Sequence, residues 1–296
     1  MKFLKSLILL FFIGSLLFSQ ERNCGTMQYL EYKKSKDSNL EQRMLDNENL
    51  IQNWITNQPE SSNNSIITIP VVVHVVYYNS TENISVAQIQ SQIDVLNEDF
   101  RRLNSDAINT PIPFQAIAAD CQIEFCLATT DPNGNPTNGI TRTQTNQSSF
   151  STNDNVKFTS SGGIDAWNTS NYLNMWVCDI SGGILGYAQF PGGASSTDGV
   201  VVDYAYFGNT GTATFPFSLG RTATHEVGHY LNLRHIWGDS NCGNDYCNDT
   251  PVHSSSNSGC PSFPSPSNCS GNGSHGDMFM NYMDYTDDGC MNLFTQ

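Results

Sequence analysis

The chain has 296 residues, enough for one substantial domain with appendages or for two small domains. Its 13 Lys and Arg residues against 28 Asp and Glu residues give a formal net charge of −15. This argues against a nucleic-acid partner, because phosphate binding needs clustered basic side chains. The acidity fits a soluble protein in a salty or calcium-containing medium.

The N-terminal segment MKFLKSLILLFFIGSLLFSQ predicts a secretory signal peptide over residues 1–20. Lys2 and Lys5 precede an apolar run at 7–18 that is too short to span a membrane, although an uncleaved N-terminal anchor is the alternative. The nine cysteines agree with export, because disulfides persist in oxidising compartments. We therefore expect a secreted protein without a stable membrane anchor.

The next segment, residues 21–62, is polar and charged, and we interpret it as a removable pro-segment because the composition changes abruptly after it. Residues 66–78, IITIPVVVHVVYY, are β-branched and almost wholly apolar, and predict a buried strand. Ser85 and Gln88 then form a capping box, and apolar residues recur at helical spacing up to Leu103. A long helix is predicted there.

Further strands are predicted at residues 121–128, 172–180 and 199–207, with a short glycine-flanked edge strand around 185–189 and a second helix around 225. This order indicates a mixed α/β (α+β) domain with a twisted sheet. Beyond residue 235 the chain is rich in Gly, Ser, Asn and Pro and holds five cysteines. We expect one catalytic domain at 63–296, with an N-terminal subdomain to about 235 and a loop-rich, cross-linked C-terminal subdomain at 236–296.

Three of the six histidines fall inside RTATHEVGHYLNLRHIWGD, residues 221–239. His225 and His229 are four residues apart and project from one face of a helix, where both can bind one ion. His235 lies six residues further on, so the chain must leave the helix and fold back, and Asn232 stands where a left-handed residue is needed. Three imidazoles with an open fourth position are typical of a catalytic zinc site.

Glu226 lies one step round the helix, too far offset to be a comfortable ligand. It is placed to accept a proton from a water held on the metal and to pass it to the leaving amine. A structural zinc site would leave this carboxylate unexplained, and chance rarely gives three histidines this spacing. A non-catalytic secreted binding or adhesion module, stabilised by zinc, is the alternative of another class. We predict a hydrolase, and the edge strand favours a protein or peptide substrate.

The segment HEVGHYLNLRH resembles the extended zinc motif of the metzincin metallopeptidases, with Asn232 in place of the usual glycine. The following IWGD and the later GDMFMNYMDYTDDGCMNLFT are similar to the pappalysin family, particularly its short microbial members. The resemblance runs from about residue 66 to the end. It implies a metzincin-like catalytic domain and a zinc-dependent endopeptidase made as a zymogen.

Several site residues follow from this resemblance. Met283 would be the methionine of the Met-turn, an apolar floor beneath the three ligands, and Tyr285 would stabilise the oxyanion. Asp288 would lie at the base of the pocket for the side chain after the scissile bond and select Arg or Lys. The edge strand, with Gly186 and Tyr187, would form the rim of the cleft, where substrate adds as an antiparallel strand.

The segment CGNDYCNDTP resembles the calcium loop of the family, and the implied ligands are Asp245, the Cys247 carbonyl and Thr250. A hydrogen-bonded turn is the alternative. The spacing of four other cysteines resembles an interlaced pair of bridges, Cys242 to Cys269 and Cys260 to Cys290.

Cys24 lies in RNCGT, just after the signal. A thiolate delivered from a pro-segment would fill the fourth zinc position, and the glycine after it would let the backbone come close to the metal. This resembles the cysteine switch used for latency among metzincins. The alternative is an unpaired or intermolecularly bridged cysteine in a disposable tail. The sequence gives no indication of the oligomeric state.

Overall fold

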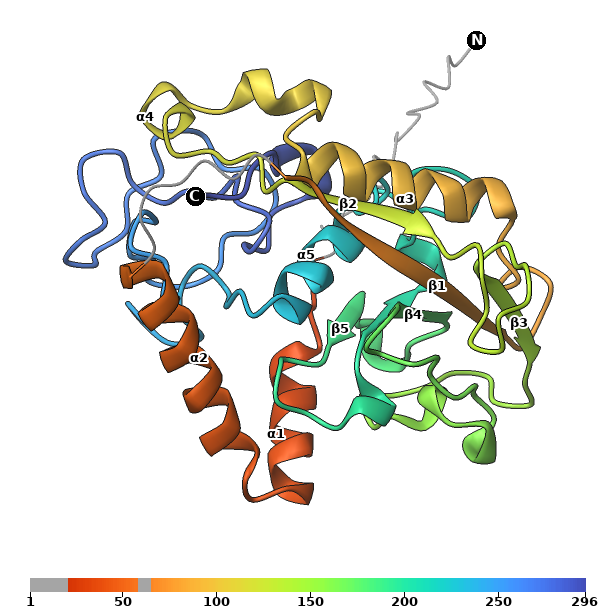
Figure 1. Ribbon diagram of the computed structural model, residues 1–296. Coiled ribbons are helices and arrows are strands. Elements are labelled where there is room, and N and C mark those ends of the chain that lie inside the picture. The colour runs from red at the N-terminus through yellow and green to blue at the C-terminus, as the bar shows by residue number, and fades with distance from the viewer. Residues whose placement is uncertain (1–20, 58–64) are drawn as a thin grey trace, which may run out of the picture.

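The computed structural model describes residues 21–57 and 65–296, so the predicted signal peptide at 1–20 lies outside the described residues (Figure 1). In this part of the chain the strands form one six-stranded sheet in the order β2-β1-β4-β6-β5, with β3 also paired to β1. The ladders are parallel except the one between β5 and β6. The predicted mixed sheet is therefore confirmed. The strands are β1 (Ile67–Tyr77), β2 (Ile123–Leu127), β3 (Ile140–Gln144), β4 (Leu173–Cys178), β5 (Gly186–Ala188) and β6 (Val200–Asp203).

Strand β1 pairs with β2, β3 and β4, and its residues 71–76 are covered on both faces of the sheet. Val71, Val73 and Val75 point into the core beneath the helices, whereas Val76 belongs to a second core on the opposite face. A strand buried on both sides has no solvated face, which is why its sequence is a continuous apolar run and not an alternating one.

Helix α3 (Val86–Phe100) begins as predicted and ends earlier. The Gln88 backbone N–H donates to Ser85 Oγ at 3.1 Å, but the Gln88 side chain donates to Phe207 O and so does not complete the capping box. The chain leaves the helix at Arg102, whose φ is 51°, and Leu103 is 70% exposed. The expectation that Leu103 continues the buried helical face is therefore wrong.

Helix α5 (Arg221–Tyr230) lies between α3 and the edge strand β5 (Figure 1). Its Arg221 guanidinium donates to Asp106 Oδ1 at 2.8 Å and lies 3.5 Å from Asp99 of α3. Asp99 also accepts hydrogen bonds from Thr224 and from the Tyr282 hydroxyl, and burial raises its pKa to about 6. This buried polar network fixes the helix relative to both α3 and the C-terminal part of the chain.

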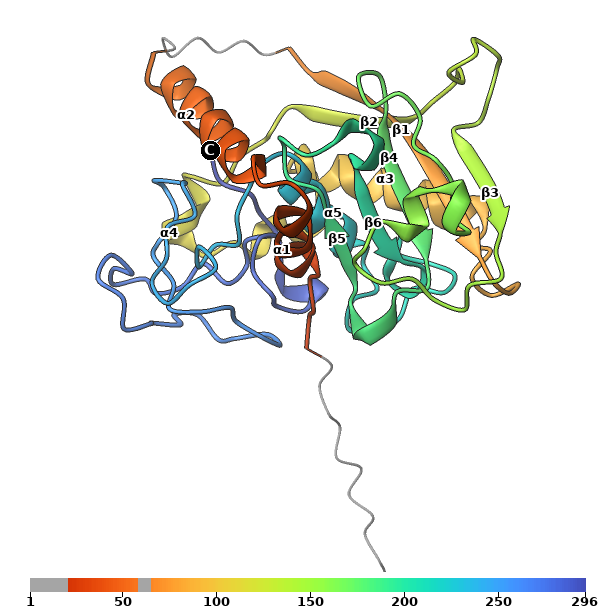
Figure 2. The ribbon, with the colours of Figure 1, turned by 90° about the horizontal axis from the view of Figure 1, so that it is seen from below.

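The predicted pro-segment contains two helices, α1 (Thr26–Lys36) and α2 (Leu40–Asn57), that the sequence analysis did not anticipate. Figures 1 and 2 show α1 beside β5 and α2 turning back toward the C-terminal loops. Leu30, Leu40 and Met44 form a small apolar cluster with Phe190 of the main domain. Residues 21–57 are thus folded onto the rest of the chain.

The C-terminal subdomain is mostly loops, as predicted, and two disulfides cross-link its described residues. They join Cys242 to Cys269 and Cys260 to Cys290, which confirms the pairing implied by the family resemblance. The remaining helix, α4 (Ile112–Gln115), is a single turn at the side of this subdomain.

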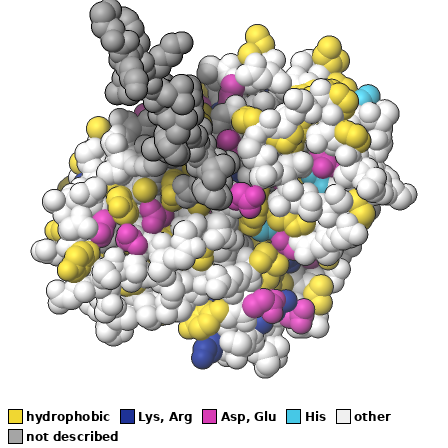
Figure 3. All heavy atoms as spheres, turned by 180° about the vertical axis from the view of Figure 1, so that it is seen from behind, with side chains coloured by type: hydrophobic (Ala, Val, Ile, Leu, Met, Phe, Trp, Pro, Cys, Tyr) yellow, Lys and Arg dark blue, Asp and Glu magenta, His cyan; other side chains and the backbone are white. Residues whose placement is uncertain are grey.

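The surface reflects the acidic composition. On the face opposite to that of Figure 1, acidic side chains are scattered widely and basic ones show as small spots (Figure 3). Within residues 21–57 and 65–296, no helix has the length and apolar character needed to cross a membrane.

Candidate active site

Helix α5 presents His225 and His229 on one face and stops one residue later, at Tyr230. Asn232 has a φ of 80°, and the Leu233 backbone N–H donates to the Gly228 carbonyl at 2.9 Å. This is a left-handed helix cap, and the predicted turn at Asn232 is confirmed. The turn sends the chain back beneath the helix and brings His235 toward the first two histidines.

The three imidazoles converge on one point. His229 Nε2 lies 3.1 Å from the Nε2 atoms of both His225 and His235. Two nitrogens bound tetrahedrally to one zinc ion, each about 2.0–2.1 Å away, would be about 3.3 Å apart. Cys24 Sγ belongs to the same group, and the four ligand atoms all lie within 4.8 Å of one another.

The outer nitrogen of each ring is held by a hydrogen bond. His225 Nδ1 donates to the Tyr282 carbonyl at 2.7 Å, and His229 Nδ1 donates to the Leu233 carbonyl at 2.8 Å. His235 Nδ1 is bonded to the Asp239 carboxylate. These partners place the ring protons on Nδ1, so that each Nε2 directs a lone pair inward.

Burial lowers the pKa of His225 and of His229 well below the usual value, so both rings are neutral, as metal ligands must be. Three neutral nitrogens and a thiol sulfur around one centre form a donor set suited to zinc. Asp239 was not predicted as a site residue, although an acidic residue four positions after His235 is a possible signal.

Glu226 lies beside the cluster with its carboxylate toward β5. The side chain is 1% exposed, and burial raises its pKa to about 7. Its Oε2 accepts a hydrogen bond from the Thr26 hydroxyl at 2.8 Å and lies 3.5 Å from Cys24 Sγ. A Cβ at Gly186 would come within 2.8 Å of Glu226 Cγ, so this close approach of strand and helix needs glycine.

Residues 23–25 pair with the edge of β5 and cover this site. Leu185 N–H donates to the Asn23 carbonyl at 2.9 Å, and Gly25 N–H donates to the Gly186 carbonyl at 2.8 Å. The pairing of Cys24 with Gly186 is parallel. Edge strand β5 is therefore present where it was predicted, and its pairing with residues 23–25 places Cys24 beside the histidines.

Met283 and Tyr285 approach the histidines from the C-terminal subdomain. Met283 is buried, and a Cβ at Gly228 would meet its Sδ at 2.5 Å, so the methionine lies directly against the zinc helix. The Tyr285 ring lies 5.0 Å from the His235 ring, and its hydroxyl is 3.5 Å from the Cys24 carbonyl. Both side chains are thus beside the candidate metal centre.

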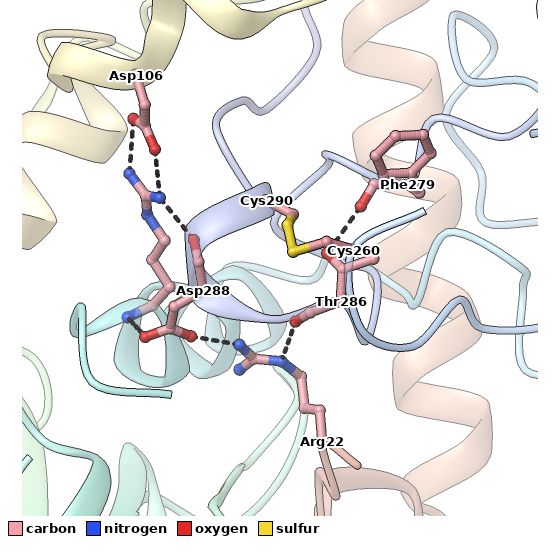
Figure 4. The surroundings of a disulfide bond; sticks show 8 residues. Arg22, Asp106, Cys260, Phe279, Thr286, Asp288 and Cys290 are labelled. Carbon is pink, nitrogen blue, oxygen red and sulfur yellow. Dashed lines mark hydrogen bonds and ion pairs between the residues drawn. A yellow bond between two sulfur atoms is a disulfide. The ribbon is translucent and has the colours of Figure 1, made fainter. Parts of the chain in front are cut away.

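Asp288 is fully buried and faces Arg22, from the N-terminal part of the described residues (Figure 4). Arg22 Nη2 is 2.5 Å from Asp288 Oδ1, and Arg22 Nε donates to the Thr286 carbonyl at 3.1 Å. The Arg22 guanidinium also stacks on Phe217, 4.8 Å from the ring centroid. Arg22 was not predicted as a site residue, although it is a basic residue two positions before Cys24.

The three groups of the predicted calcium loop come together. Thr250 Oγ1 donates to Asp245 Oδ2 at 2.7 Å and lies 2.8 Å from the Cys247 carbonyl. In the same loop Asp249 Oδ2 is buried without a hydrogen-bond partner among the described residues. Calcium at this position stays a prediction.

Comparisons with known proteins agree with this geometry. Residues 152–296 match the Peptidase M43 family, described as pregnancy-associated plasma protein-A. Tannerella forsythia mature mirolysin in complex with a cleaved peptide is 60% identical, with a TM-score of 0.76 over 78% of this chain and 88% of that chain. A mutant of promirolysin from the same organism is 54% identical, with a TM-score of 0.84 over 93% and 90%. An extracellular metalloprotease of Pyricularia oryzae is 33% identical over 78% of this chain and 72% of that protein.

The fold, the histidine cluster and these matches together define a metzincin-type zinc metallopeptidase. Within that class, the chain belongs to the pappalysin family, peptidase family M43.

Asp239→Asn should weaken zinc binding by roughly tenfold to a hundredfold, because an amide is a weaker acceptor for His235 Nδ1 than a carboxylate. Asparagine tolerates the left-handed backbone at this position, where φ is 57°. Competition with a chromophoric chelator measures the affinity, and Asp120→Asn on the exposed surface is the control. Equal affinities in the two variants would contradict the positioning role of Asp239.

Proposed function

We propose that this chain is a secreted endopeptidase, made as a zymogen, that cleaves peptide bonds before arginine and lysine. The observation that carries the proposal is the position of Arg22. Its guanidinium fills the pocket of Asp288 while Cys24, two residues on, lies against the three histidines. The pro-segment thus presents a basic side chain and a zinc ligand to the two places that a protease of this specificity requires.

His225, His229 and His235 would hold the zinc ion. When bound, zinc acidifies a water molecule and polarises the scissile carbonyl. Glu226 accepts the proton of the attacking water and delivers it to the leaving nitrogen. The neighbouring Thr26 hydroxyl already donates to Glu226 Oε2, so this oxygen is oriented to accept a proton from the cleft. The Tyr285 hydroxyl shares the charge that develops on the carbonyl oxygen.

Substrate binds along β5 once the pro-segment has left. The Leu185 N–H, the Gly186 carbonyl and the Ala188 N–H, now paired with the pro-segment, become available to an extended peptide. Substrate takes the antiparallel direction, opposite to that of the pro-segment. Main-chain pairing positions the peptide bond with little dependence on sequence.

The basic preference comes from the surroundings of Asp288. Arg22 is 4% exposed and satisfies this buried carboxylate, which also accepts from the Leu219 N–H at 2.8 Å. A neutral side chain would leave the charge of Asp288 without its counter-charge in a buried pocket. In the mature enzyme the residue after the scissile bond replaces Arg22 there.

Latency follows from the same contacts. Residues 21–57 contact the rim strand, the metal centre and the specificity pocket at once, and the Cys24 thiol blocks the fourth zinc position, so the unprocessed chain is inactive. The matched mirolysin exists in pro and mature forms, and the matched fungal relatives are named extracellular. These names and the apolar segment at 1–20 support export as a zymogen.

A structural calcium ion in the 242–250 loop is part of the proposal. Asp245, the Cys247 carbonyl and Thr250 offer oxygen ligands in one place, and burial together with Asp249 raises the pKa of Asp245. Two partly buried carboxylates in one loop, Asp245 and Asp249, are stabilised by a hard cation.

Glu226→Gln in the processed enzyme should lower kcat/KM by roughly 10²–10⁴-fold, because the amide cannot accept the proton of the attacking water. Metal analysis should show one zinc per chain in the variant and the parent alike. Glu98→Gln, on the exposed side of α3, is the matched control. Near-parental activity of Glu226→Gln would rule out the mechanism.

Cys24→Ala should give a proenzyme that cleaves short peptides before any processing, because the fourth zinc position is then open. Intact-mass analysis during the assay verifies that the pro-segment is still attached. Cys126→Ala, which removes an exposed free thiol, serves as the control. A Cys24→Ala proenzyme as silent as its parent would exclude the thiol switch.

Asp288→Asn should lower kcat/KM for cleavage before Arg by roughly ten- to a hundredfold and spare cleavage before neutral residues, because a charge-assisted hydrogen bond is lost. Mapping the cuts in a mixed peptide pool measures both effects. Asp287→Asn, which makes the same substitution at the preceding residue, is the control. A parent enzyme whose cuts show no enrichment of Arg or Lys on the C-terminal side would contradict the assigned specificity.

A further inference from the structure

A second side chain of the pro-segment is buried as deeply as Arg22, and it lies on the other face of the sheet. After Cys24 the chain passes over the edge of β5 and begins α1, and Tyr29 enters the core cluster that contains Trp176 and Tyr187. Tyr29 is 1% exposed, and its ring centroid lies 4.9 Å from that of Tyr187. The mechanism described above makes no use of this contact.

The hydroxyl of Tyr29 meets a buried ion pair of the main domain. It donates to Asp154 Oδ1 and accepts from Lys157 Nζ at 3.0 Å. Lys157 is fully buried, donates to the Thr197 carbonyl at 2.7 Å and lies 3.3 Å from Asp154 Oδ1. Lys157, Asp154 and Thr197 all stay with the domain when the pro-segment is removed.

Removal of the pro-segment leaves this pair incompletely satisfied. Lys33, four residues after Tyr29, lies 3.1 Å from Asp154 Oδ2, so the carboxylate loses two partners and Lys157 loses one. Lys157 is fully buried beneath Tyr29, and this burial lowers the pKa of its ammonium to about 8. Buried charges of this kind are costly unless their hydrogen bonds are completed.

The group that replaces Tyr29 must accept a hydrogen bond from the Lys157 ammonium and donate one to the Asp154 carboxylate. A hydroxyl can do both. The walls add a requirement for an aromatic ring, because Lys157 Nζ lies 4.5 Å from the Tyr29 ring centroid and Tyr187 packs against the same ring. Phenylalanine would leave the Asp154–Lys157 pair without the hydroxyl that completes its hydrogen bonds, and an acidic side chain would be repelled by Asp154. The pocket therefore matches a phenol.

The direction of the pro-segment places this pocket relative to the cut. Arg22 takes the position of the residue after the scissile bond, and Cys24 lies at the metal. Tyr29 therefore lies on the side of the residues that precede the cut. The chain from Cys24 to Tyr29 consists of two extended residues followed by three helical residues, which together span about 11 Å. An extended substrate covers this distance with about three residues.

We propose that the pocket of Asp154 and Lys157 is a second specificity site of the mature enzyme, which binds a tyrosine side chain about three residues before the cleaved bond. This proposal rests on the proposed function, since it assumes that the enzyme cleaves before Arg after the pro-segment has left. Tyr29 occupies in the zymogen the place that the substrate tyrosine takes afterwards.

The test uses the processed, zinc-loaded enzyme and quenched fluorescent peptides with one Arg after the cleaved bond. Tyr, Phe or Ala is placed in turn at each position from two to five before that bond. We expect Tyr to exceed Phe in kcat/KM by at least about tenfold at one position, through a lower KM. Equal values for Tyr and Phe at every position would overturn the proposal. Failure to cleave any peptide of the set before its Arg would instead refute the proposed function.

Asp154→Asn should reduce the ratio of Tyr to Phe by about tenfold, because the phenol loses its charged acceptor. Asp165→Asn, an exposed acid of the same segment, should leave the ratio as in the parent. A tyrosine preference that survives Asp154→Asn unchanged would place the binding site elsewhere and overturn the assignment. The comparison of peptides needs no variant and remains decisive if Asp154→Asn fails to fold.

Discussion

Three imidazole rings point their inner nitrogens at one another inside this protein, with His229 Nε2 only 3.1 Å from its two neighbours. Because the Nδ1 atoms carry the protons, these inner atoms are lone pairs that repel one another unless a cation lies between them. The left-handed turn at Asn232, the carboxylate of Asp239 and the methionine against Gly228 all serve to hold this arrangement. The metal centre is thus a constraint on the fold as well as its reactive group.

The pro-segment satisfies the groups that the cleft leaves unpaired. Its backbone pairs with the edge of β5, Arg22 neutralises Asp288, and Tyr29 completes the ion pair of Lys157. Each of these groups is costly to bury without a partner. The pro-segment and the substrate therefore bind through the same interactions. The groups that the pro-segment pairs are the groups that a substrate must pair in the mature enzyme.

Features that depend on neighbouring residues could be predicted from the sequence, whereas contacts between distant parts of the chain could not. The zinc motif, the Ser85 cap and the apolar run of β1 are each read within a few residues. Helices α1 and α2 were missed because they are polar and bury few side chains, so that docking on the domain stabilises them more than their own sequence does. The pairs of Arg22 with Asp288 and of Tyr29 with Lys157 join distant parts of the chain, and no spacing rule predicts such contacts.

The parallel pairing of Cys24 with Gly186 affects whether the pro-segment is itself cleaved in the active site. A backbone laid in this direction exchanges the places of its carbonyl and N–H groups relative to a peptide laid the opposite way. Its peptide bonds therefore reach the zinc site in the reversed orientation, with the amide nitrogen where the carbonyl carbon of a substrate would lie. Because its backbone runs in the reversed direction, this segment can lie in the active site without being cleaved there. Its release therefore depends on cleavage at another position in the chain.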